Sequence, residues 1–327
     1  MSILSTSLSR IKESPTIAIT QKARLLKESG KEVIALASGE PDFDTPDNIK
    51  AAAIKAIKEG QTKYTPVDGT PELKKAIVNK FKKENNLSFE VDNITVGTGG
   101  KQVIYNCILA TINPGDEVII PAPYWVSYAD IALVSDAKPI IVECGIEQKF
   151  KMTASQLEKA ITSKTKLLIL NSPSNPTGAV YSKEELISLA DVLIKHPNIL
   201  IGTDDMYEHV KLKDMPFYNI LNVNPALKDR CVVMNGVSKA YSMTGWRIGY
   251  AAGPSYIIKA MEILQSQSTS NPTSISQVAA EAALSGDQAC MDPMIKAFRE
   301  RHAYVVKSFN EIPGLSCIEA EGAFYAF

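Results

Sequence analysis

The chain has 327 residues, of which 45% are hydrophobic and 22% charged, a balance typical of a soluble globular protein with a large core. Its 35 basic and 36 acidic residues leave a formal charge of -1, so the overall charge does not favour nucleic acid or an anionic lipid surface as a partner. No apolar stretch approaches the roughly 18 residues that a membrane helix needs, and a small-molecule ligand is therefore favoured.

The chain begins with the Ser-rich, mildly basic stretch MSILSTSLSRIKESP, which lacks the apolar region of a secretory signal. The five cysteines stand singly without a CxxC pair, and His196, His209 and His302 lack the i, i+4 spacing of a helical metal site. We therefore expect a cytoplasmic protein without a disulfide framework and without a metal.

Short apolar runs alternate with helical patterns from about residue 90 to 253. The runs are NITVG (93–97), DEVIIPA (116–122), KPIIVEC (138–144), TKLLILNSP (165–173), NILIGTD (198–204), RCVVMNG (230–236) and WRIGYAAG (246–253). Several lack polar alternation, as is typical of strands that helices cover on both faces. The pattern predicts an α/β fold with a parallel or mixed sheet.

Helices are expected to connect these strands. In SKEELISLADVLIKH (182–196), Ser182 can cap the helix start and Glu185 completes an S-x-x-E capping box. Ligands of such sheets bind beyond the carboxyl ends of the strands, so the residues that follow each apolar run are the candidates for chemistry.

A glycine cluster, VGTGGKQV (96–103), joins a predicted strand to a predicted helix. Its backbone N–H groups could converge on a phosphate, but a tight strand-to-helix turn explains the cluster equally well. A nucleotide P-loop is excluded, because Thr95 stands where that motif needs its first glycine and Gln102 follows Lys101 where it needs Ser or Thr.

Two acids and a tyrosine lie at the end of the fifth predicted strand, in GTDDMYEHV (202–210). Asp204 could pair with a protonated ring nitrogen, and Tyr207 could donate a hydrogen bond to an oxyanion. Taken alone, this segment favours a different interpretation, in which Asp204 or Asp205 is the N-cap of a helix.

A lysine and an arginine lie on either side of a turn in VSKAYSMTGWRIGY (237–250). A lysine partly removed from water has a lowered pKa, so the neutral amine of Lys239 could condense with an aldehyde. The planar guanidinium of Arg247 suits a phosphate, because it can form two parallel hydrogen bonds. A solvated loop lysine is the alternative for Lys239.

The two ends of the chain differ from this central part. The first 45 or so residues and those after about 255 read as helices rich in Lys, Glu and Ala, followed by two β-like runs, GLSCIEA (314–320) and AFYAF (323–327). A second lobe built from both ends would account for them. Because the last apolar run ends at Phe327 without a polar tail, we expect the natural chain to continue.

The combination of these motifs, and their order along the chain, resembles the class I aminotransferases, which are pyridoxal-phosphate enzymes of fold type I. Within that class the chain is most similar to the bacterial aspartate aminotransferase subgroup. The motifs that carry the resemblance are IKESPTIAI, ASGEPDFDTPDNIK, KYTPVDGTPELKKAI, GTGGKQVIYN, PAPYWVSY, NSPSNPTG, DDMYEH, VSKAYSMTGWRIGYAAGP and EGAFYAF. The resemblance covers essentially the whole chain.

The resemblance implies a mostly parallel sheet sandwiched by helices and a smaller α+β domain built from both chain ends. Residues 1–45 would form an N-terminal arm and part of the small domain, 46–285 the large cofactor-binding domain, and 286–327 the start of an incomplete small domain. The implied cofactor is pyridoxal 5'-phosphate, and the implied assembly is a homodimer.

The implied reaction transfers the amino group of L-aspartate to 2-oxoglutarate by a ping-pong route, giving oxaloacetate and L-glutamate, with prephenate or arogenate transamination as a second activity to consider. A pyridoxal-phosphate β-lyase or another class I aminotransferase remains an alternative. A non-catalytic regulator with the same fold is less favoured, because such regulators carry an N-terminal winged-helix module.

The resemblance assigns roles around the cofactor ring. Lys239 would form the Schiff base and then move the proton between the substrate α-carbon and cofactor C4'. Asp204 would keep the pyridine nitrogen protonated. Tyr207 and Asn175 would hydrogen-bond the 3'-oxygen, Trp125 would stack on the ring, and Asn175 and Trp125 would also contact substrate.

Further roles concern the phosphate and the substrate. Gly99, Gly100, Ser238 and Arg247 would hold the phosphate, and Tyr64 would reach the phosphate of the neighbouring subunit.

For the substrate, the backbone of Gly39 would meet a carboxylate. Lys101, in the cofactor cradle, would meet the distal carboxylate, and Lys12 is similar to a lysine linked to a second dicarboxylic substrate. The family's α-carboxylate arginine, in an R-x-S-[YF]-A stretch, is missing, and Arg299 and Arg301 do not match it.

Overall fold

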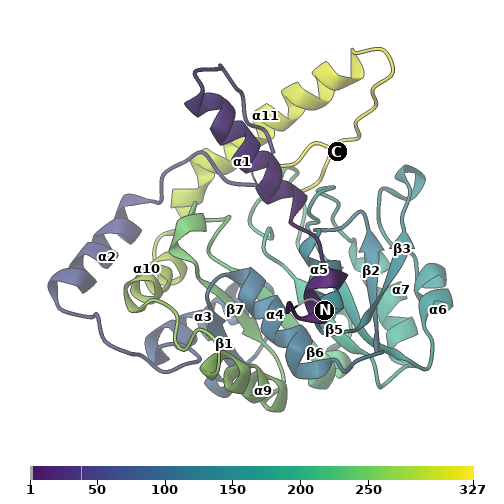
Figure 1. The fold of residues 1–327 in the computed structure, drawn as a ribbon, viewed down its shortest axis with the longest axis horizontal. Coiled ribbons are helices and arrows are strands. Elements are labelled where there is room, and N and C mark those ends of the chain that lie inside the picture. The colour runs from purple at the N-terminus through teal and green to yellow at the C-terminus, as the bar shows by residue number, and fades with distance from the viewer. Residues whose placement is uncertain (1–2, 38) are drawn as a thin grey trace.

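All seven apolar runs form strands of one sheet in the computed structural model, which describes residues 3–37 and 39–327. The strands are β1 (Ile94–Gly97), β2 (Glu117–Ala122), β3 (Lys138–Glu143), β4 (Thr165–Asn171), β5 (Leu200–Asp204), β6 (Cys231–Gly236) and β7 (Gly249–Ala252). The α/β fold that the sequence predicts is therefore confirmed (Figure 1).

The strand order is β1-β7-β6-β5-β4-β2-β3, and only β7 runs against its neighbours within this described sheet. In the register of the parallel strands, Asn171 at the end of β4 pairs with Asp204 at the end of β5, which in turn pairs with Met234 of β6. The carboxyl ends of three central strands thus meet at one edge of the sheet, where the predicted site residues follow.

Helices cover both faces of the sheet. The helices are α1 (Pro15–Glu28), α2 (Asp47–Lys58), α3 (Pro71–Asn85), α4 (Gly100–Thr111), α5 (Ser127–Val134), α6 (Ala154–Ala160), α7 (Lys183–Leu193), α8 (Ile220–Val223), α9 (Ser255–Ser266), α10 (Ser274–Ser285) and α11 (Asp292–Asn310). Short 3-10 turns are η1 (Thr6–Arg10), η2 (Val91–Asn93), η3 (Ile146–Gln148), η4 (Pro225–Arg230), η5 (Thr244–Trp246) and η6 (Gln288–Met291).

Alternate residues of the central strands enter two separate cores, which explains why these strands are apolar throughout. Val232 and Met234 of β6 pack with α4, α5 and α9, whereas Cys231 and Val233 pack with the helices of the opposite face, including α3, α7 and α10. Successive side chains of a strand point to opposite faces, so a strand covered on both sides has no polar face.

Local signals in the sequence set the helix starts. Ser182 Oγ accepts the Glu185 N–H, and the Glu185 carboxylate accepts the Ser182 N–H (2.7 Å), so the predicted capping box of α7 is confirmed. None of the helices in the described residues combines the length and apolar character needed to cross a bilayer.

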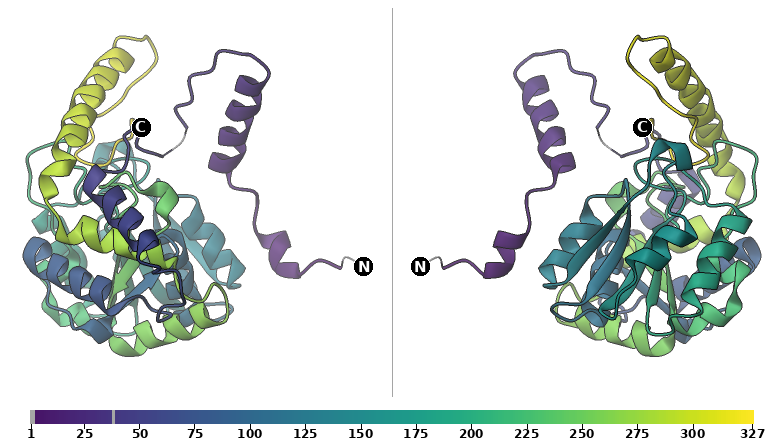
Figure 2. Two further views of the ribbon diagram at one scale, coloured as in Figure 1. Left: turned by 90° about the vertical axis from the view of Figure 1, so that its left-hand side faces the viewer. Right: turned by 90° about the vertical axis from the view of Figure 1, so that its right-hand side faces the viewer.

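The ends of the chain project from the body of the molecule. Figure 1 and Figure 2 show α1 and α11 extending from the same side of the sheet, and α1 buries none of its residues. The predicted β-like runs at 314–320 and 323–327 are wrong, because the described residues after α11 form no strand and make only one bridge, between Gly322 and Lys211. A segment with β-forming residues becomes a strand only when another strand pairs with it, and this segment instead packs on loops.

Candidate active site

A cavity of about 410 Å³ lies beyond the carboxyl ends of the central strands. The predicted site residues that line it are Gly39, Gly100, Lys101, Trp125, Asn175, Asp204, Tyr207, Ser238, Lys239 and Arg247. They come from the segment before α2, from the connections after β1, β2, β4, β5 and β6, and from the turn before β7. The fold therefore collects side chains that are up to 208 positions apart, from 39 to 247.

One end of the cavity combines cations with a helix N-terminus. Helix α4 begins at Gly100, and Gly99 before it has a φ of 82°. A Cβ on Gly99 would lie only 2.1 Å from Arg247 Nη2, and a Cβ on Gly249 would lie 2.3 Å from the Gly100 nitrogen. These glycines let the guanidinium, the loop and β7 pack closely. The strand-to-helix turn is confirmed, and a phosphate at this turn stays a prediction.

Lys101 and Trp125 form one wall near this end. The Lys101 Nζ lies 5.1 Å from the centre of the Trp125 ring, a cation–π distance. Burial and the neighbouring Arg247 charge lower the pKa of Lys101. This wall offers a flat aromatic face beside a cation.

Asp204 is the last residue of β5, and its buried carboxylate accepts two hydrogen bonds. The Tyr128 hydroxyl donates to Oδ2 at 2.6 Å, and the Met206 N–H donates to Oδ1 at 3.2 Å. Burial raises the pKa of Asp204, and the Tyr128 hydrogen bond opposes that rise. No helix follows among residues 205–210, so the helix N-cap alternative is wrong, and Asp205 instead accepts a hydrogen bond from Asn219 (2.7 Å).

Tyr207 lies at the same rim, with its hydroxyl 2.5 Å from that of Tyr325. Burial is the main reason why the pKa of Tyr207 lies well above its usual value, and a hydrogen bond with Asn175 lowers it in part. The phenol therefore stays protonated at neutral pH and can donate a hydrogen bond into the cavity.

Lys239 is partly buried, and its Nζ donates to the Gly39 carbonyl. Burial lowers the pKa of Lys239 to about 8, and the charge of Arg247 acts in the same direction, against the carboxylates of Glu40 and Asp204. The alternative of a solvated loop lysine is wrong for this environment. Near neutral pH a larger fraction of this amine is neutral than in an exposed lysine, as a nucleophile or base requires.

Two predicted residues lie away from the cavity of their own chain. Tyr64 is 92% exposed, and Lys12 is exposed in the segment before α1. Arg299 and Arg301 bind Asp214 and Asp42, so both guanidinium groups already have carboxylate partners.

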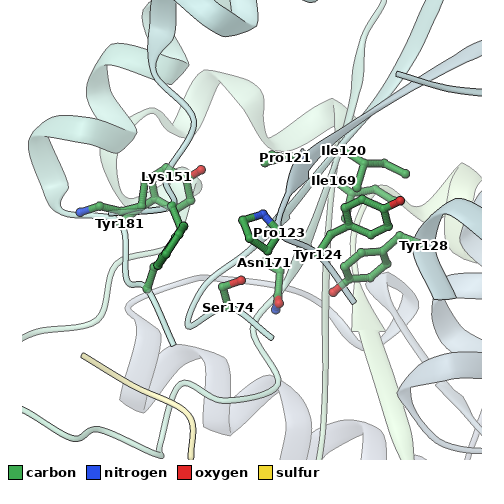
Figure 3. A pocket seen from close by; sticks show the side chains of 12 residues that line it. Ile120, Pro121, Pro123, Tyr124, Tyr128, Lys151, Ile169, Asn171, Ser174 and Tyr181 are labelled. Carbon is green, nitrogen blue, oxygen red and sulfur yellow. The ribbon is translucent and has the colours of Figure 1, made fainter. Parts of the chain in front are cut away.

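A smaller cavity of about 20 Å³ lies on the other side of Tyr128. Figure 3 shows Tyr124 and Tyr128 on one side of it, with Lys151 and Tyr181 opposite. This space is sufficient for about one water molecule and too small for a substrate. The larger cavity is therefore the candidate active site.

Glu84, Glu208 and His209 bring potential metal ligands within 4.8 Å of one another. The Lys80 ammonium, whose side chain is fully buried, already donates to Glu208 and lies 3.7 Å from Glu84. Because a lysine cation takes the place that a metal would need, we propose no metal here.

Sequence reasoning missed two tyrosines of the site. Tyr128 follows Trp125 by three positions, and Tyr325 lies in the EGAFYAF motif, so both were within recognised segments. Their only sequence signal was their proximity to those motifs, because their partners are 76 and 118 positions away.

The family model that describes aminotransferase class I and II matches residues 31–327. An aspartate/prephenate aminotransferase of Nitrosomonas europaea is 62% identical over 324 residues, which cover 99% of this chain and 82% of that protein. One of Cereibacter sphaeroides is 57% identical over 327 residues, covering 100% of this chain and 82% of its own length.

Solved structures agree in fold. An aspartate aminotransferase from Rhizobium meliloti superposes with a TM-score of 0.96 at 49% identity, covering 100% of this chain and 82% of its own. The Thermus thermophilus aspartate aminotransferase with maleate gives a TM-score of 0.95 at 40% identity, with coverage of 100% and 85%.

Proposed function

This chain belongs to the aminotransferase class I and II family, and from that premise we propose that it transfers the amino group of L-aspartate to 2-oxoglutarate. Its cofactor is pyridoxal 5'-phosphate. Prephenate is proposed as a further amino acceptor, because the relatives at 62% and 57% identity carry that substrate in their names. The observation that supports transfer most directly is that a partly buried lysine with a lowered pKa and a buried aspartate line the same cavity.

The residues of the cavity fit this cofactor. Gly99 and Gly249 have no side chains, which allows close packing at the turn that begins α4. The helix N-terminus, Arg247, Lys101 and Ser238 provide hydrogen-bond donors for a phosphate there. The volume of about 410 Å³ accommodates a substituted pyridine ring together with a small amino acid. Trp125 offers its face to an aromatic ring.

When bound, the cofactor supplies an aldehyde that captures an amino group and a protonated pyridine that accepts the electron pair of the α-carbon. Lys239 would hold the cofactor through its amine and would move a proton at the substrate α-carbon. Asp204 would keep the ring nitrogen protonated through its negative charge. Tyr207 and Asn175 would donate hydrogen bonds to the ring's 3'-oxygen.

Substrate carboxylates would be met by the backbone at Gly39 and by Lys101, both in the cavity wall. Lys12, which lies outside the cavity in this chain, is proposed to approach a second dicarboxylic substrate. Tyr64 is proposed to complete the phosphate site of a neighbouring subunit in a homodimer. We further propose a cytoplasmic location.

We also propose a division of the chain into a large cofactor-binding domain and a smaller domain. Residues 46–285, which contain the sheet, form the cofactor-binding domain. Residues 1–45 form an arm and part of a small domain, and 286–327 contribute the start of that domain.

The test measures both products and the covalent link. The full-length protein loaded with pyridoxal 5'-phosphate should convert L-aspartate and 2-oxoglutarate into oxaloacetate and L-glutamate, and borohydride reduction should fix the cofactor on the peptide that contains Lys239. Lys239→Ala should abolish both. Because the amine reacts when neutral, loading should accelerate as the pH rises toward about 8 and level off above it.

A β-lyase is the second candidate, since the same lysine serves that chemistry. It would release ammonia and pyruvate from a cysteine conjugate without forming glutamate. Label on another peptide, or ammonia release with no amino transfer, would overturn the proposed function.

A further inference from the structure

Tyr325 brings a second phenol to the rim of the cavity. Its hydroxyl lies 2.5 Å from the Tyr207 hydroxyl, and the two rings meet edge to face with centres 5.7 Å apart. Tyr325 also lines the cavity. The pair therefore shares one hydrogen bond at the wall of the cavity that both tyrosines line.

The same hydroxyl limits the position of Gly39. A Cβ on Gly39 would lie 2.7 Å from Tyr325 Oη but 3.6 Å from its Cζ, an ordinary contact. The Tyr325 oxygen, and no other part of the ring, thus excludes a side chain at position 39.

Tyr325 is held on the same loops that carry its partners. The Ala323 N–H donates to the Val210 carbonyl (2.9 Å), and the Gly322 N–H donates to the Gly178 carbonyl (2.9 Å). The first loop follows Tyr207, and the second contains Asn175. The position of the Tyr325 hydroxyl relative to Tyr207 is therefore fixed by main-chain hydrogen bonds.

We propose that Tyr325 is a positioning residue that orients the Tyr207 proton and sets the distance between Gly39 and Tyr207. This inference rests on the proposed function. Burial raises the pKa of Tyr325 to about 12 and that of Tyr207 well above its usual value, so each phenol carries one proton.

Across a single hydrogen bond only one of two phenols can donate. Tyr207 must direct its proton to the 3'-oxygen of the cofactor, and Tyr325 is then the donor to Tyr207. Donation to the Tyr207 oxygen polarises its O–H bond and strengthens the hydrogen bond that Tyr207 gives.

The first test removes the hydroxyl with Tyr325→Phe in the cofactor-loaded chain and titrates the absorbance of the lysine-bound cofactor against pH. A weaker bond from Tyr207 stabilises the ionised 3'-oxygen less, so the pKa of this chromophore should rise by about half a unit. Tyr304→Phe is the matched control, because Tyr304 is 72% exposed, and it should leave the titration unchanged.

The second test is a double-mutant cycle with Gly39→Ala. In the parent chain the new methyl group meets the Tyr325 oxygen, and we expect KM for L-aspartate to rise by roughly tenfold with a smaller change in kcat. In the Tyr325→Phe background the methyl meets only the ring carbon, so the same substitution should change KM by less than about twofold.

The outcomes separate the two proposals. A normal parent chromophore together with an unshifted Tyr325→Phe titration, or equal Gly39→Ala penalties in both backgrounds, would overturn the role of Tyr325 alone. A parent chain that forms no chromophore would overturn the proposed function and this inference with it.

Discussion

The carboxylate of Asp204 is held by donors from two different parts of the chain, the Tyr128 hydroxyl and the Met206 N–H. Burial raises the pKa of Asp204, whereas both hydrogen bonds lower it, so each donor helps to keep the carboxylate ionised. An ionised group is needed to pair with a protonated ring nitrogen. Tyr128 is therefore expected to influence the reaction through Asp204.

Replacing this tyrosine tests that role. Tyr128→Phe removes a hydrogen bond to a charged group, which contributes about 1.5–3 kcal/mol, so we expect kcat to fall by roughly 10- to 100-fold. The pKa of Asp204 should rise, and the loss should therefore be larger at low pH than at high pH. The measurement is the pH profile of kcat for L-aspartate.

Tyr124→Phe provides the matched control, since Tyr124 lies beside Tyr128 at the smaller cavity (Figure 3). It should leave the pH profile unchanged. A Tyr128→Phe protein with the parent profile would contradict the role given to Tyr128.

At the residue scale, the sequence was informative where a side chain directly follows a strand. Lys239 and Asp204 could be placed at one rim because parallel strands end at the same edge of a sheet. Tyr128 and Tyr325 could not be placed in this way. Each meets its partner through an orientation that only the packing of α5 and of the 322–325 segment determines.

At the scale of elements, helix α3 is tied to the turn after β5 by a buried ion pair. The side chain of Lys80 is fully buried, that of Glu208 is 4% exposed, and Asn85 and Asn235 donate to Glu208 as well. Burial alone would raise the pKa of Glu208, but the Lys80 charge and these hydrogen bonds outweigh it and lower the pKa to about 2. Glu208 directly follows Tyr207, so the Lys80–Glu208 ion pair also helps to hold Tyr207 in place.

Glu208→Gln should strongly destabilise the chain, because it leaves a buried ammonium without its closest carboxylate. Breaking a buried pair from one side costs about 3–5 kcal/mol in the free energy of unfolding. The folded-state pKa of Glu208 lies below its unfolded value, so its contribution is fully present above about pH 5 and is lost as the pH falls toward 2. The difference between parent and variant should therefore narrow on acidification.

Urea unfolding at neutral and at acidic pH measures this difference. Glu158→Gln serves as the control, because its partner His196 lies 3.4 Å away on the surface and such pairs contribute about 0–1 kcal/mol. A pH-independent difference, or a loss no larger than that of the control, would contradict the buried-pair account. Adding Lys80→Met should recover part of the loss, since it removes the unpaired ammonium.

Element prediction succeeded where a segment is buried on both faces and failed where tertiary contacts decide. The strands of the sheet could be found because most of their runs are apolar at successive positions, as is typical of strands that are buried on both faces. The runs at 314–320 and 323–327 have the composition of strands but find no neighbouring strand in the described residues. Main-chain hydrogen bonds from Glu321 and Gly322 to the Gly178 carbonyl, and from Ala323 to the Val210 carbonyl, hold the start of the second run in an irregular path.

At the scale of the whole molecule, the segment around Tyr64 is rigidly held although its tyrosine is exposed. Gln277, which is fully buried, accepts the Thr70 N–H at 2.8 Å and donates to Thr65 Oγ1 at 2.9 Å. The Ser274 hydroxyl donates to the Gln61 carbonyl at 2.8 Å. Helix α10 thus anchors residues 61–70, and the Tyr64 side chain is exposed and does not line its own cavity.

Mixing two inactive or weakened subunits distinguishes whether Tyr64 serves its own site or that of a partner. Tyr64→Phe keeps Lys239 but lacks the phenol, whereas Lys239→Ala keeps the phenol but cannot bind the cofactor covalently. If Tyr64 acts within its own chain, no mixture of the two contains a complete site. If it acts across a homodimer, each mixed dimer contains one complete site, so an equal mixture should regain about a quarter of the sites.

The readout is cofactor binding at a concentration below the dissociation constant of the Tyr64→Phe protein, so that its own homodimers remain largely empty. The phosphate contact is a hydrogen bond to a charged group, and its loss should weaken binding by about 1.5–3 kcal/mol, which separates the two kinds of site clearly. A mixture of Tyr304→Phe with Lys239→Ala controls for the mixing itself and should bind as the parent does in every site that retains Lys239. Co-purification of differently tagged subunits measures exchange. If this measurement shows mixed dimers and the Tyr64→Phe mixture still gains no tight sites, the cross-subunit role of Tyr64 is wrong.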